Sequence, residues 1–497
     1  MQYKSTRNSK ISITSAQAIK QGLSVEGGLF IPETLPAVTS DEIASFAKMD
    51  YRGRAFAILS KFLTDFTKDE LENCINSAYT KAKFETDNIA PVYKLNDKEY
   101  ILELWHGPTC AFKDMALQIL PHLLTTSMKK TNEESEVVIL VATSGDTGKA
   151  ALEGFRDVKG TRIVVFYPEN GVSEIQKLQM VTQEGDNVGV AAVAGNFDDA
   201  QNGVKKIFTD EDYKAHLADK GFKLSSANSI NWGRLVPQIV YYFSAYADML
   251  AGGEIQNGDK INIVVPTGNF GNILAAYYAK KMGLPVNKFI CASNKNNVLT
   301  DFIKTGEYDK NRDFYTTISP SMDILISSNL ERLLSDLFDG NDEEITKLMK
   351  ALNTEGKYKV PEEIRDKISD LFYAGCADDD ETMQAIKDCQ EEYGYVIDTH
   401  TAVAKSVYAE YAKSTGDETK TVIASTASPF KFGRSVLNAI DTKYDALSDF
   451  EQIDELARIA NVAIPNAIDE IRNAPVLHDH ICEKDAMVDE VKKFLNI

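Results

Sequence analysis

The sequence lacks the cysteine patterns of a disulfide-stabilised or zinc-binding protein. It has six cysteines, which are scattered without a CxxC pair: Cys74, Cys110, Cys291, Cys376, Cys389 and Cys482. Disulfide frameworks and zinc sites need clustered or regularly spaced cysteines. We therefore expect reduced thiols, no metal site and a cytoplasmic location.

Long apolar runs and an excess of positive charge are also missing. No apolar run approaches the about 20 residues of a membrane span, and the first ten residues, MQYKSTRNSK, lack the apolar core of a signal peptide. The 74 Asp and Glu outnumber the 54 Lys and Arg, which gives a formal charge of -20. Such a chain repels phosphate backbones and anionic lipids. We expect no nucleic-acid or membrane partner, and an anionic substrate would have to be bound by local N–H groups and one or two cations.

What the sequence does contain is a regular alternation of short apolar runs and helical patterns. With 497 residues it is long enough for two or three domains. The apolar runs are EVVILVA (136–142), TRIVVFYP (161–168), VGVAAVAG (188–195), INIVVPTG (261–268), KFICASN (288–294) and KTVIASTA (420–427). Buried strands that alternate with helices predict an α/β fold built on a mostly parallel sheet.

Two strand-to-helix loops are candidate anion sites. Gly268-Asn269-Phe270-Gly271-Asn272 follows the strand at 261–265, and the N–H groups of the next helix would face a phosphate there. Thr143-Ser144-Gly145-Asp146-Thr147-Gly148 has the same context and three hydroxyls, which suits a carboxylate or a phosphate. An ordinary helix cap, by Asn272 in one loop and by Ser144 or Thr147 in the other, is an equally good interpretation of each.

Neither loop carries a nucleotide-binding motif. The Walker pattern needs Gly where this chain has Thr143 and Ser or Thr where it has Ala150, and GxGxxG is absent from both loops. ATP and NAD are therefore disfavoured as ligands.

A third candidate is the pair of Asn228 and Arg234 in SSANSINWGRLV. A guanidinium can hold a phosphate or carboxylate through two parallel donors and keeps its charge. The alternative is a surface arginine at a helix start.

Lys113, in LWHGPTCAFKDMALQ, lies in a stretch otherwise rich in apolar residues, Gly and Pro. Burial disfavours an ammonium, so the neutral amine becomes available as a nucleophile or a base and can condense with a carbonyl. The alternative is a surface lysine paired with Asp114. One amine and two separate anion sites would suit an aldehyde cofactor that carries a phosphate, together with an anionic substrate.

Several motifs, in this order and at these separations, resemble the threonine synthase family, in its longer subgroup. They are GLSVEGGLFIPETLP, LWHGPTCAFKD, ATSGDTG, YPENGVSEIQKLQM, GNFDDAQNGVKKIF, NSINWGR, PTGNFGN, SMDILISSNLERLL, DTHTAVA and STASPFKFG. The resemblance covers nearly the whole chain. It implies a pyridoxal-phosphate-dependent enzyme of fold type II, similar to the tryptophan synthase beta subunit, with two parallel-sheet α/β domains.

Together with the helical patterns, this predicts three parts. Residues 1–95 would be mostly helical, 96–225 would be a smaller mobile α/β domain with Lys113 and the TSGDTG loop, and 226–497 would be a larger domain that binds the cofactor phosphate. An acidic helical insertion is expected at about 328–392.

The resemblance also implies roles for the candidate residues. Lys113 would bond covalently to pyridoxal phosphate, Phe112 would lie against its ring, and Thr426 would face the pyridine nitrogen. Gly268, Asn269, Phe270, Gly271 and Asn272 would hold the cofactor phosphate. The remaining roles concern the substrate. Its carboxylate, together with the cofactor's 3-oxygen, would be surrounded by Ser144, Gly145, Asp146 and Thr147. Its phosphate would be bound by Asn228 and Arg234.

The sequence departs from the family at two places. Relatives often have His where this chain has Ser428, and Pro where it has Thr399. We assign no role to Ser428. For His400, a residue of the first helical turn and a catalytic residue are both open interpretations, and we leave it out of the catalytic set.

The implied reaction converts O-phospho-L-homoserine and water to L-threonine and phosphate. Two alternatives stay open: a phospholyase that releases a 2-oxo acid and phosphate, and a non-catalytic phosphate-binding regulator. We expect the protein to be a monomer or a homodimer.

Overall fold

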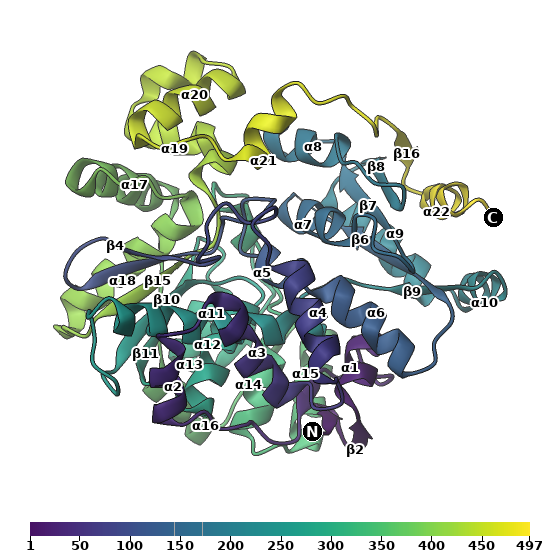
Figure 1. Cartoon of the computed structure of the whole chain (residues 1–497), viewed down its shortest axis with the longest axis horizontal. Helices are drawn as coiled ribbons and strands as arrows, with labels where there is room; N and C mark the ends of the chain where they lie inside the picture. Colours follow the sequence, from purple (N-terminus) through teal and green to yellow (C-terminus); the bar gives the residue numbers. More distant parts are fainter. Residues whose placement is uncertain (144, 171) are drawn as a thin grey trace.

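The computed structural model of the chain is organised around two β-sheets whose strands are mostly parallel (Figure 1). It describes residues 1–143, 145–170 and 172–497. The larger sheet has six strands and the smaller sheet has five. The α/β fold predicted from the sequence is confirmed.

The larger sheet runs, from edge to edge, through β14 (Phe372–Cys376), β11 (Val286–Ser293), β10 (Ile261–Pro266), β15 (Thr421–Ser425), β5 (Glu99–Glu103) and β4 (Val92–Lys94). Every pairing is parallel except that of β4 with β5. The middle strands β10 and β15 are buried along their whole length, as expected where helices cover both faces of a parallel sheet.

The smaller sheet is parallel throughout and runs through β16 (Ile481–Glu483), β8 (Val188–Ala194), β7 (Thr161–Pro168), β6 (Glu136–Ala142) and β9 (Phe222–Ser225). The predicted runs 136–142 and 161–168 coincide with β6 and β7. Their Val, Ile and Phe side chains favour a buried strand over a helix of the same length.

The helices can be grouped by the sheet or the chain region to which they belong. The N-terminal part contains α1 (Ser15–Gln21), α2 (Ser40–Phe46), α3 (Tyr51–Phe62), α4 (Lys68–Ala78), α5 (Asp114–Leu117) and α6 (Leu120–Lys130). The smaller sheet is accompanied by α7 (Asp146–Phe155), α8 (Glu174–Val181), α9 (Phe197–Thr209), α10 (Glu211–Asp219) and α22 (Met487–Leu495). The larger sheet is accompanied by α11 (Trp232–Ala251), α12 (Gly271–Met282), α13 (Val298–Thr305), η1 (Pro320–Met322), α14 (Leu330–Leu337), α15 (Asp342–Thr354), α16 (Glu362–Leu371), α17 (Asp379–Tyr393), α18 (Thr399–Thr415), η2 (Pro429–Phe432) and α19 (Gly433–Ile440). The C-terminal region adds η3 (Thr442–Ala446), α20 (Asp449–Ala460), α21 (Asn466–Asp469) and η4 (Glu470–Arg472).

The N-terminal region contains a small antiparallel sheet that the sequence did not predict. Its strands, in spatial order, are β2 (Asn8–Ile13), β1 (Tyr3–Ser5) and β3 (Phe30–Pro32). Two of them have three residues each, too few to show a period-two pattern. The prediction of a mostly helical 1–95 segment is corrected by this sheet.

The predicted domain boundaries also need correction at both ends of the smaller part. Strand β5 pairs with β15 in the larger sheet, although the predicted smaller domain began at residue 96. Strand β16 pairs with β8, and Figure 1 shows β16 and α22, in yellow, beside the blue elements of the smaller sheet. Sheet membership depends on partners more than 200 residues away, which local patterns do not reveal.

The predicted helical insertion at 328–392 is not purely helical. It includes β14 at the edge of the larger sheet and β13 (Lys357–Lys359), which pairs with β12 (Glu307–Asp309). Within the described ranges, no helix combines the length and the apolar character that a membrane span requires.

Candidate active site

The site lies where the carboxyl ends of β5, β10 and β15 meet at one edge of the larger sheet. In parallel sheets these ends are the usual place for a ligand, because the loops that leave them converge there. The loop after β5 leads to Lys113, the loop after β10 contains Gly268, and Thr426 follows β15 directly.

Lys113 immediately precedes α5 and has only 8% of its surface exposed. Its backbone is held against the end of β15: the Phe112 N–H donates to the Thr426 carbonyl at 2.8 Å, and Ala111 bridges Ala427. The Phe112 ring lies 5.3 Å from the Lys113 Nζ. Lys113, Phe112 and Thr426 are therefore brought together.

The surface pairing of Lys113 with Asp114 is excluded by the structure. The Asp114 carboxylate is fully buried and accepts hydrogen bonds from the N–H and the hydroxyl of Thr109, both at 2.8 Å. Burial raises the pKa of Asp114 to about 6, although the two hydrogen bonds oppose this shift.

The Lys113 amine has two hydrogen-bond acceptors. Its Nζ lies 3.3 Å from Asp146 Oδ2 and 3.2 Å from Ser321 Oγ. Burial lowers the pKa of Lys113, the attraction of Asp146 opposes this, and the positive charges of Lys431 and Arg234 lower it further. The amine of Lys113 is therefore neutral more often than the amine of a surface lysine.

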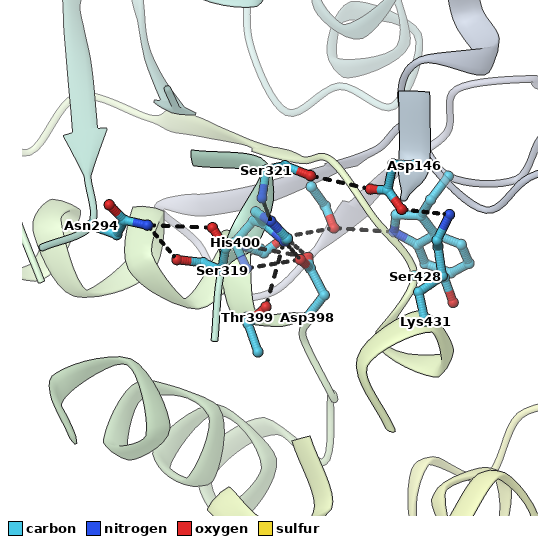
Figure 2. A network of polar contacts seen from close by, with 12 residues as sticks. Asp146, Asn294, Ser319, Ser321, Asp398, Thr399, His400, Ser428 and Lys431 are labelled. Atoms are coloured by element: carbon cyan, nitrogen blue, oxygen red, sulfur yellow. Dashed lines mark hydrogen bonds and ion pairs between the residues drawn. The ribbon is translucent and has the colours of Figure 1, made fainter. Parts of the chain in front are cut away.

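Asp146 is joined to Ser321 and Lys431 in the polar network of Figure 2. Its Oδ1 is 2.7 Å from Lys431 Nζ and accepts a 2.9 Å hydrogen bond from Gln176. Burial acts to raise the pKa of Asp146, but Lys431 and Lys113 outweigh it and hold that pKa well below its usual range. Because both carboxylate oxygens are engaged, the Asp146 side chain orders the two lysines. The expected contact of this loop with a substrate carboxylate stays a prediction.

Sequence reasoning missed Lys431 and Ser321, although both lie in motifs that carried the resemblance. Lys431 stands between Phe430 and Phe432, and its ammonium also donates to the Thr109 carbonyl at 2.9 Å. A lysine in a stretch rich in apolar residues, Gly and Pro gives the same signal that singled out Lys113.

The loop between β10 and α12 is shaped as an anion site. Phe270 adopts a left-handed conformation (φ 62°) that directs the chain into α12, whose first turn leaves N–H groups without helical partners. The loop carbonyls are fixed from outside: Asn329 donates twice to the Asn269 carbonyl, at 3.0 and 3.1 Å, and Ser327 donates to the Gly268 carbonyl at 2.8 Å.

Asn272 presents an amide donor to this loop. Its Oδ1 accepts hydrogen bonds from the hydroxyls of Tyr241, at 2.8 Å, and Tyr242. Among the described residues its buried Nδ2 has no partner. A buried amide donor without a partner is costly, and the phosphate of a ligand would satisfy it.

Arg234 lies in the first turn of α11 and Asn228 in the segment before that helix, and the two side chains have different environments. Arg234 is 4% exposed, its Nη1 donates to the Ala227 carbonyl at 2.7 Å, and its Nε has no partner in the described part of the chain. Burial lowers the pKa of Arg234 to about 10, so it stays charged at neutral pH. Asn228, next to Ala227, is exposed. The interpretation of Arg234 as a surface arginine is wrong.

In the loop before α7, Thr143 provides the cap. Its Oγ1 accepts hydrogen bonds from the N–H groups of Gly145 and Gly148, both at 3.0 Å. Gly145 has φ 147°, and a Cβ there would come within 2.6 Å of Gln176. Thr147 is half-buried. Ser144 lies outside the described residues.

These features fit pyridoxal phosphate. A buried amine can bond to its aldehyde, the Thr426 segment lies beside Phe112, and the loop before α12 offers helix N–H groups and the free Asn272 amide to a phosphate. A parallel α/β fold with such a site defines a pyridoxal-phosphate-dependent enzyme of fold type II.

Family models agree with this class over most of the chain. Residues 85–427 match "Pyridoxal-phosphate dependent enzyme", residues 2–79 match "Threonine synthase N terminus", and residues 401–475 match "Threonine synthase, C-terminal". The chain belongs to the threonine synthase family of pyridoxal-phosphate-dependent enzymes.

Known proteins of this family resemble the chain along most of its length. Threonine synthase from Pseudomonas aeruginosa is 39% identical over 440 residues, which cover 88% of this chain and 90% of the relative. Human threonine synthase-like 1 is 42% identical over 439 residues, 86% of this chain; the aligned part spans 58% of that longer relative. The crystal structure of PLP-bound threonine synthase from Brucella melitensis superposes with a TM-score of 0.88 at 32% identity, covering 100% of this chain and 99% of the other.

Proposed function

We propose that the protein is a threonine synthase, which converts O-phospho-L-homoserine and water to L-threonine and phosphate. The observation that carries the proposal is the buried Lys113 amine beside the anion loop before α12, with a second cationic group, Arg234, close enough to lower the Lys113 pKa. One amine and two anion sites match an aldehyde phosphate and a phosphorylated amino acid. The resemblance to bacterial and yeast threonine synthases supports the same reaction.

Pyridoxal phosphate, when bound, supplies an aldehyde for covalent bonding and withdraws electrons from the substrate's α carbon. Lys113 is the group that the substrate amine displaces. Its neutral amine then takes the α proton, gives that proton up and, as a neutral amine again, takes a β proton, which prepares the γ phosphate to leave. Water adds at the β carbon before the α carbon is reprotonated.

Arg234 and Asn228 are proposed to bind the substrate phosphate. Arg234 is buried, charged and has an unused Nε donor among the described contacts. The charge on the departing phosphate grows during the reaction, so a fixed cation there stabilises the transition state more than the ground state. The N–H groups at the start of α7 are proposed to take the substrate carboxylate.

Water must reach the β carbon only after phosphate has left. We propose that the part of the chain carrying α7 closes over the substrate, which would exclude water until then. Limited proteolysis with and without a substrate analogue tests this closure. Equal cleavage rates in both conditions would contradict it.

All six thiols are free in the structure, which suits a reducing compartment, and we propose the cytoplasm. For the assembly we propose a monomer or a homodimer, which sedimentation at several protein concentrations decides.

A second candidate is phosphate elimination from the same kind of substrate, ending in a 2-oxo acid. It is favoured by the 42% identity to human threonine synthase-like 1, which exceeds the 39% to the Pseudomonas enzyme. Both reactions use the same amine and the same anion sites.

The test supplies O-phospho-L-homoserine to the purified holoenzyme and measures inorganic phosphate together with the organic product. Equal amounts of threonine and phosphate support the proposal, and a 2-oxo acid supports the second candidate. A Lys113→Ala variant run in parallel should release no phosphate. Release of neither product by the wild type would overturn both candidates.

A further inference from the structure

Ser321 is the second hydrogen-bond acceptor of the Lys113 amine. It lies in η1, a segment far from Lys113 in the sequence, and its Oγ accepts from Lys113 Nζ at 3.2 Å and donates to Asp146 Oδ2 at 3.2 Å. Figure 2 shows Ser321 between Asp146 on one side and His400 on the other. Lys113, Ser321 and Asp146 form a closed triangle of hydrogen bonds.

The backbone of Ser321 is held by His400. The Ser321 N–H donates to His400 Nε2 at 3.1 Å. An acceptor at Nε2 requires the proton on Nδ1, and the Asp398 Oδ1 lies 2.9 Å from that nitrogen. Asp398 caps α18 as well, accepting from the N–H groups of His400 and Thr401. Both side chains are buried, so the ring has one fixed tautomer and one fixed orientation.

The same segment is fixed on its other side by Asp323. Its Oδ1 accepts from the amides of Asn294, at 2.7 Å, and Asn296, at 3.0 Å, and from the Thr317 hydroxyl at 2.8 Å. Asn294 follows β11 directly and also donates to Ser319, as Figure 2 shows. The position of Ser321 is therefore set by the rigid ends of β11 and α18 and not by η1 alone.

The chemistry of a primary amine gives this triangle a function. A neutral amine has two hydrogens and one lone pair. Asp146 Oδ2 and Ser321 Oγ can accept both hydrogens, which leaves the lone pair without a partner among them. An amine held in this way is oriented as a base, whereas one acceptor alone would leave it free to rotate about the Cε–Nζ bond.

We propose that Ser321 is a catalytic residue that orients the Lys113 amine for proton transfer, and that Asp398 and His400 are positioning residues that act through Ser321. This rests on the proposed role of Lys113 as the base. In the proton-transfer step, the Lys113 lone pair takes a proton from the substrate carbon. The ammonium that forms then donates to Asp146 Oδ2 and Ser321 Oγ. Ser321 keeps its own proton throughout, on the hydrogen bond to Asp146.

The test compares the holoenzyme and the cofactor-free protein of the wild type and four variants. Ser321→Ala removes the acceptor, Ser321→Cys replaces it with a poor acceptor of similar size, and Ser321→Thr retains it. Ser319→Ala is the matched control, because Ser319 lies two residues away and its hydroxyl contacts Asn294 and Thr317. Two rates are measured against pH: kcat, and the rate at which the cofactor-free protein regains its visible absorbance after pyridoxal phosphate is added.

The second rate reports attack by the Lys113 amine and needs no substrate, so it tests Ser321 even if the proposed overall reaction is wrong. The charged groups that face the amine are Asp146 from α7, Lys431 from η2 and Arg234 from α11, and none is altered in these variants.

We expect Ser321→Ala and Ser321→Cys to lower the plateau of both rates about tenfold, the size of one lost hydrogen bond. KM and the cofactor dissociation constant should keep their wild-type values, and Ser321→Thr should restore most of both rates. Wild-type plateaus in Ser321→Ala, or an equal loss in Ser319→Ala, would overturn the proposal. If Ser321→Ala does not fold, the same outcomes apply to Ser321→Cys.

His400→Gln extends the test to the positioning residues. The amide oxygen of Gln can still accept from the Ser321 N–H, so we expect a smaller loss in the plateau than for Ser321→Ala and no change in KM. A loss in His400→Gln that persists undiminished when Ser321→Ala is already present would show that His400 acts independently of Ser321. That result would overturn its positioning role.

Discussion

Asp146 and Lys431 form a buried ion pair that connects the two sheet-containing parts of the molecule. Asp146 begins α7, which packs on the smaller sheet, and Lys431 lies in η2, which follows β15 of the larger sheet; their charged atoms are 2.7 Å apart. Lys113 lies on the other carboxylate oxygen of Asp146. The ion pair therefore fixes the acceptor that the Lys113 amine uses.

Replacing Lys431 with Met should destabilise the protein by about 3 kcal/mol, because Asp146 is left as a buried carboxylate with a single cationic partner. Denaturant unfolding at pH 7 measures this. Lys443→Met is the control, since Lys443 forms an exposed pair with Asp441 and should leave stability nearly unchanged. Equal effects of the two substitutions on the unfolding free energy would contradict a large contribution of the buried ion pair to stability.

The Asp146 pair also predicts a pH dependence. The folded-state pKa of Asp146 lies below its value in the unfolded chain, so its contribution to stability is present above the ordinary Asp pKa of 3.8 and is lost as pH falls through the lower folded value. Asp146→Asn should remove this acid-side loss. The stability difference between wild type and variant should shrink below pH 4, and a constant difference down to pH 2 would contradict it.

For Asp114 we expect the opposite dependence: its contribution to stability falls as the pH rises. Its pKa is raised to about 6 in the folded protein from an ordinary value of 3.8, so the folded state holds a proton that the unfolded state has lost between these values. Raising the pH from 4 to 7 should therefore remove about 2 kcal/mol from the wild type that Asp114→Asn does not lose. Unfolding free energies of both proteins at pH 4, 5, 6 and 7 measure it. Parallel curves would show that Asp114 titrates normally.

Gly268→Ala should weaken cofactor binding. An added Cβ would lie 2.9 Å from the Ser321 carbonyl and 3.5 Å from Met322 Cα, so the anion loop and η1 would have to separate, at a cost of about 1–3 kcal/mol. Fluorescence titration of the cofactor-free protein with pyridoxal phosphate gives the dissociation constant. Gly433→Ala is the control, because the nearest atom to its Cβ is 3.9 Å away and its backbone is helical. Unchanged affinity in Gly268→Ala would contradict the close approach of the two loops.

Arg234→Lys should lower kcat/KM for the phosphorylated substrate about 100-fold. Lys keeps the charge but lacks the forked pair of donors, and its hydrogen bond to the Ala227 carbonyl would be lost. Steady-state kinetics measure the change, with Arg434→Lys as an exposed control paired with Asp445 and Asp449. Full activity of Arg234→Lys would show that the site needs only a positive charge.

The sequence predicted the elements of this fold whose signals are local. Runs of Val and Ile gave β6 and β7 at their observed bounds, and the glycines around Asn269 indicated the loop before α12. It did not place β5 in the larger sheet or β16 in the smaller one, because strand pairing depends on contacts across hundreds of residues. The three-residue strands β1 and β3 are too short to produce a pattern.

The residues of the candidate site also divide into those with a local sequence signal and those whose role depends on distant contacts. Lys113, Gly268 and Arg234 stand out because their residue types are unusual for their local context. Ser321 and His400 do not, since a serine after a proline and a histidine in a first helical turn are ordinary locally. Their significance comes from the approach of η1 and α18 to Lys113, which only the three-dimensional structure displays.

The proposed reaction depends most directly on which lysine bonds to the cofactor. Reducing the purified holoenzyme with borohydride fixes that bond, and peptide mass spectrometry then locates the added pyridoxyl group. The structure predicts the group on Lys113, whose amine is buried beside the Phe112 ring. A group on Lys431 or on any other lysine, or no reducible bond at all, would contradict it.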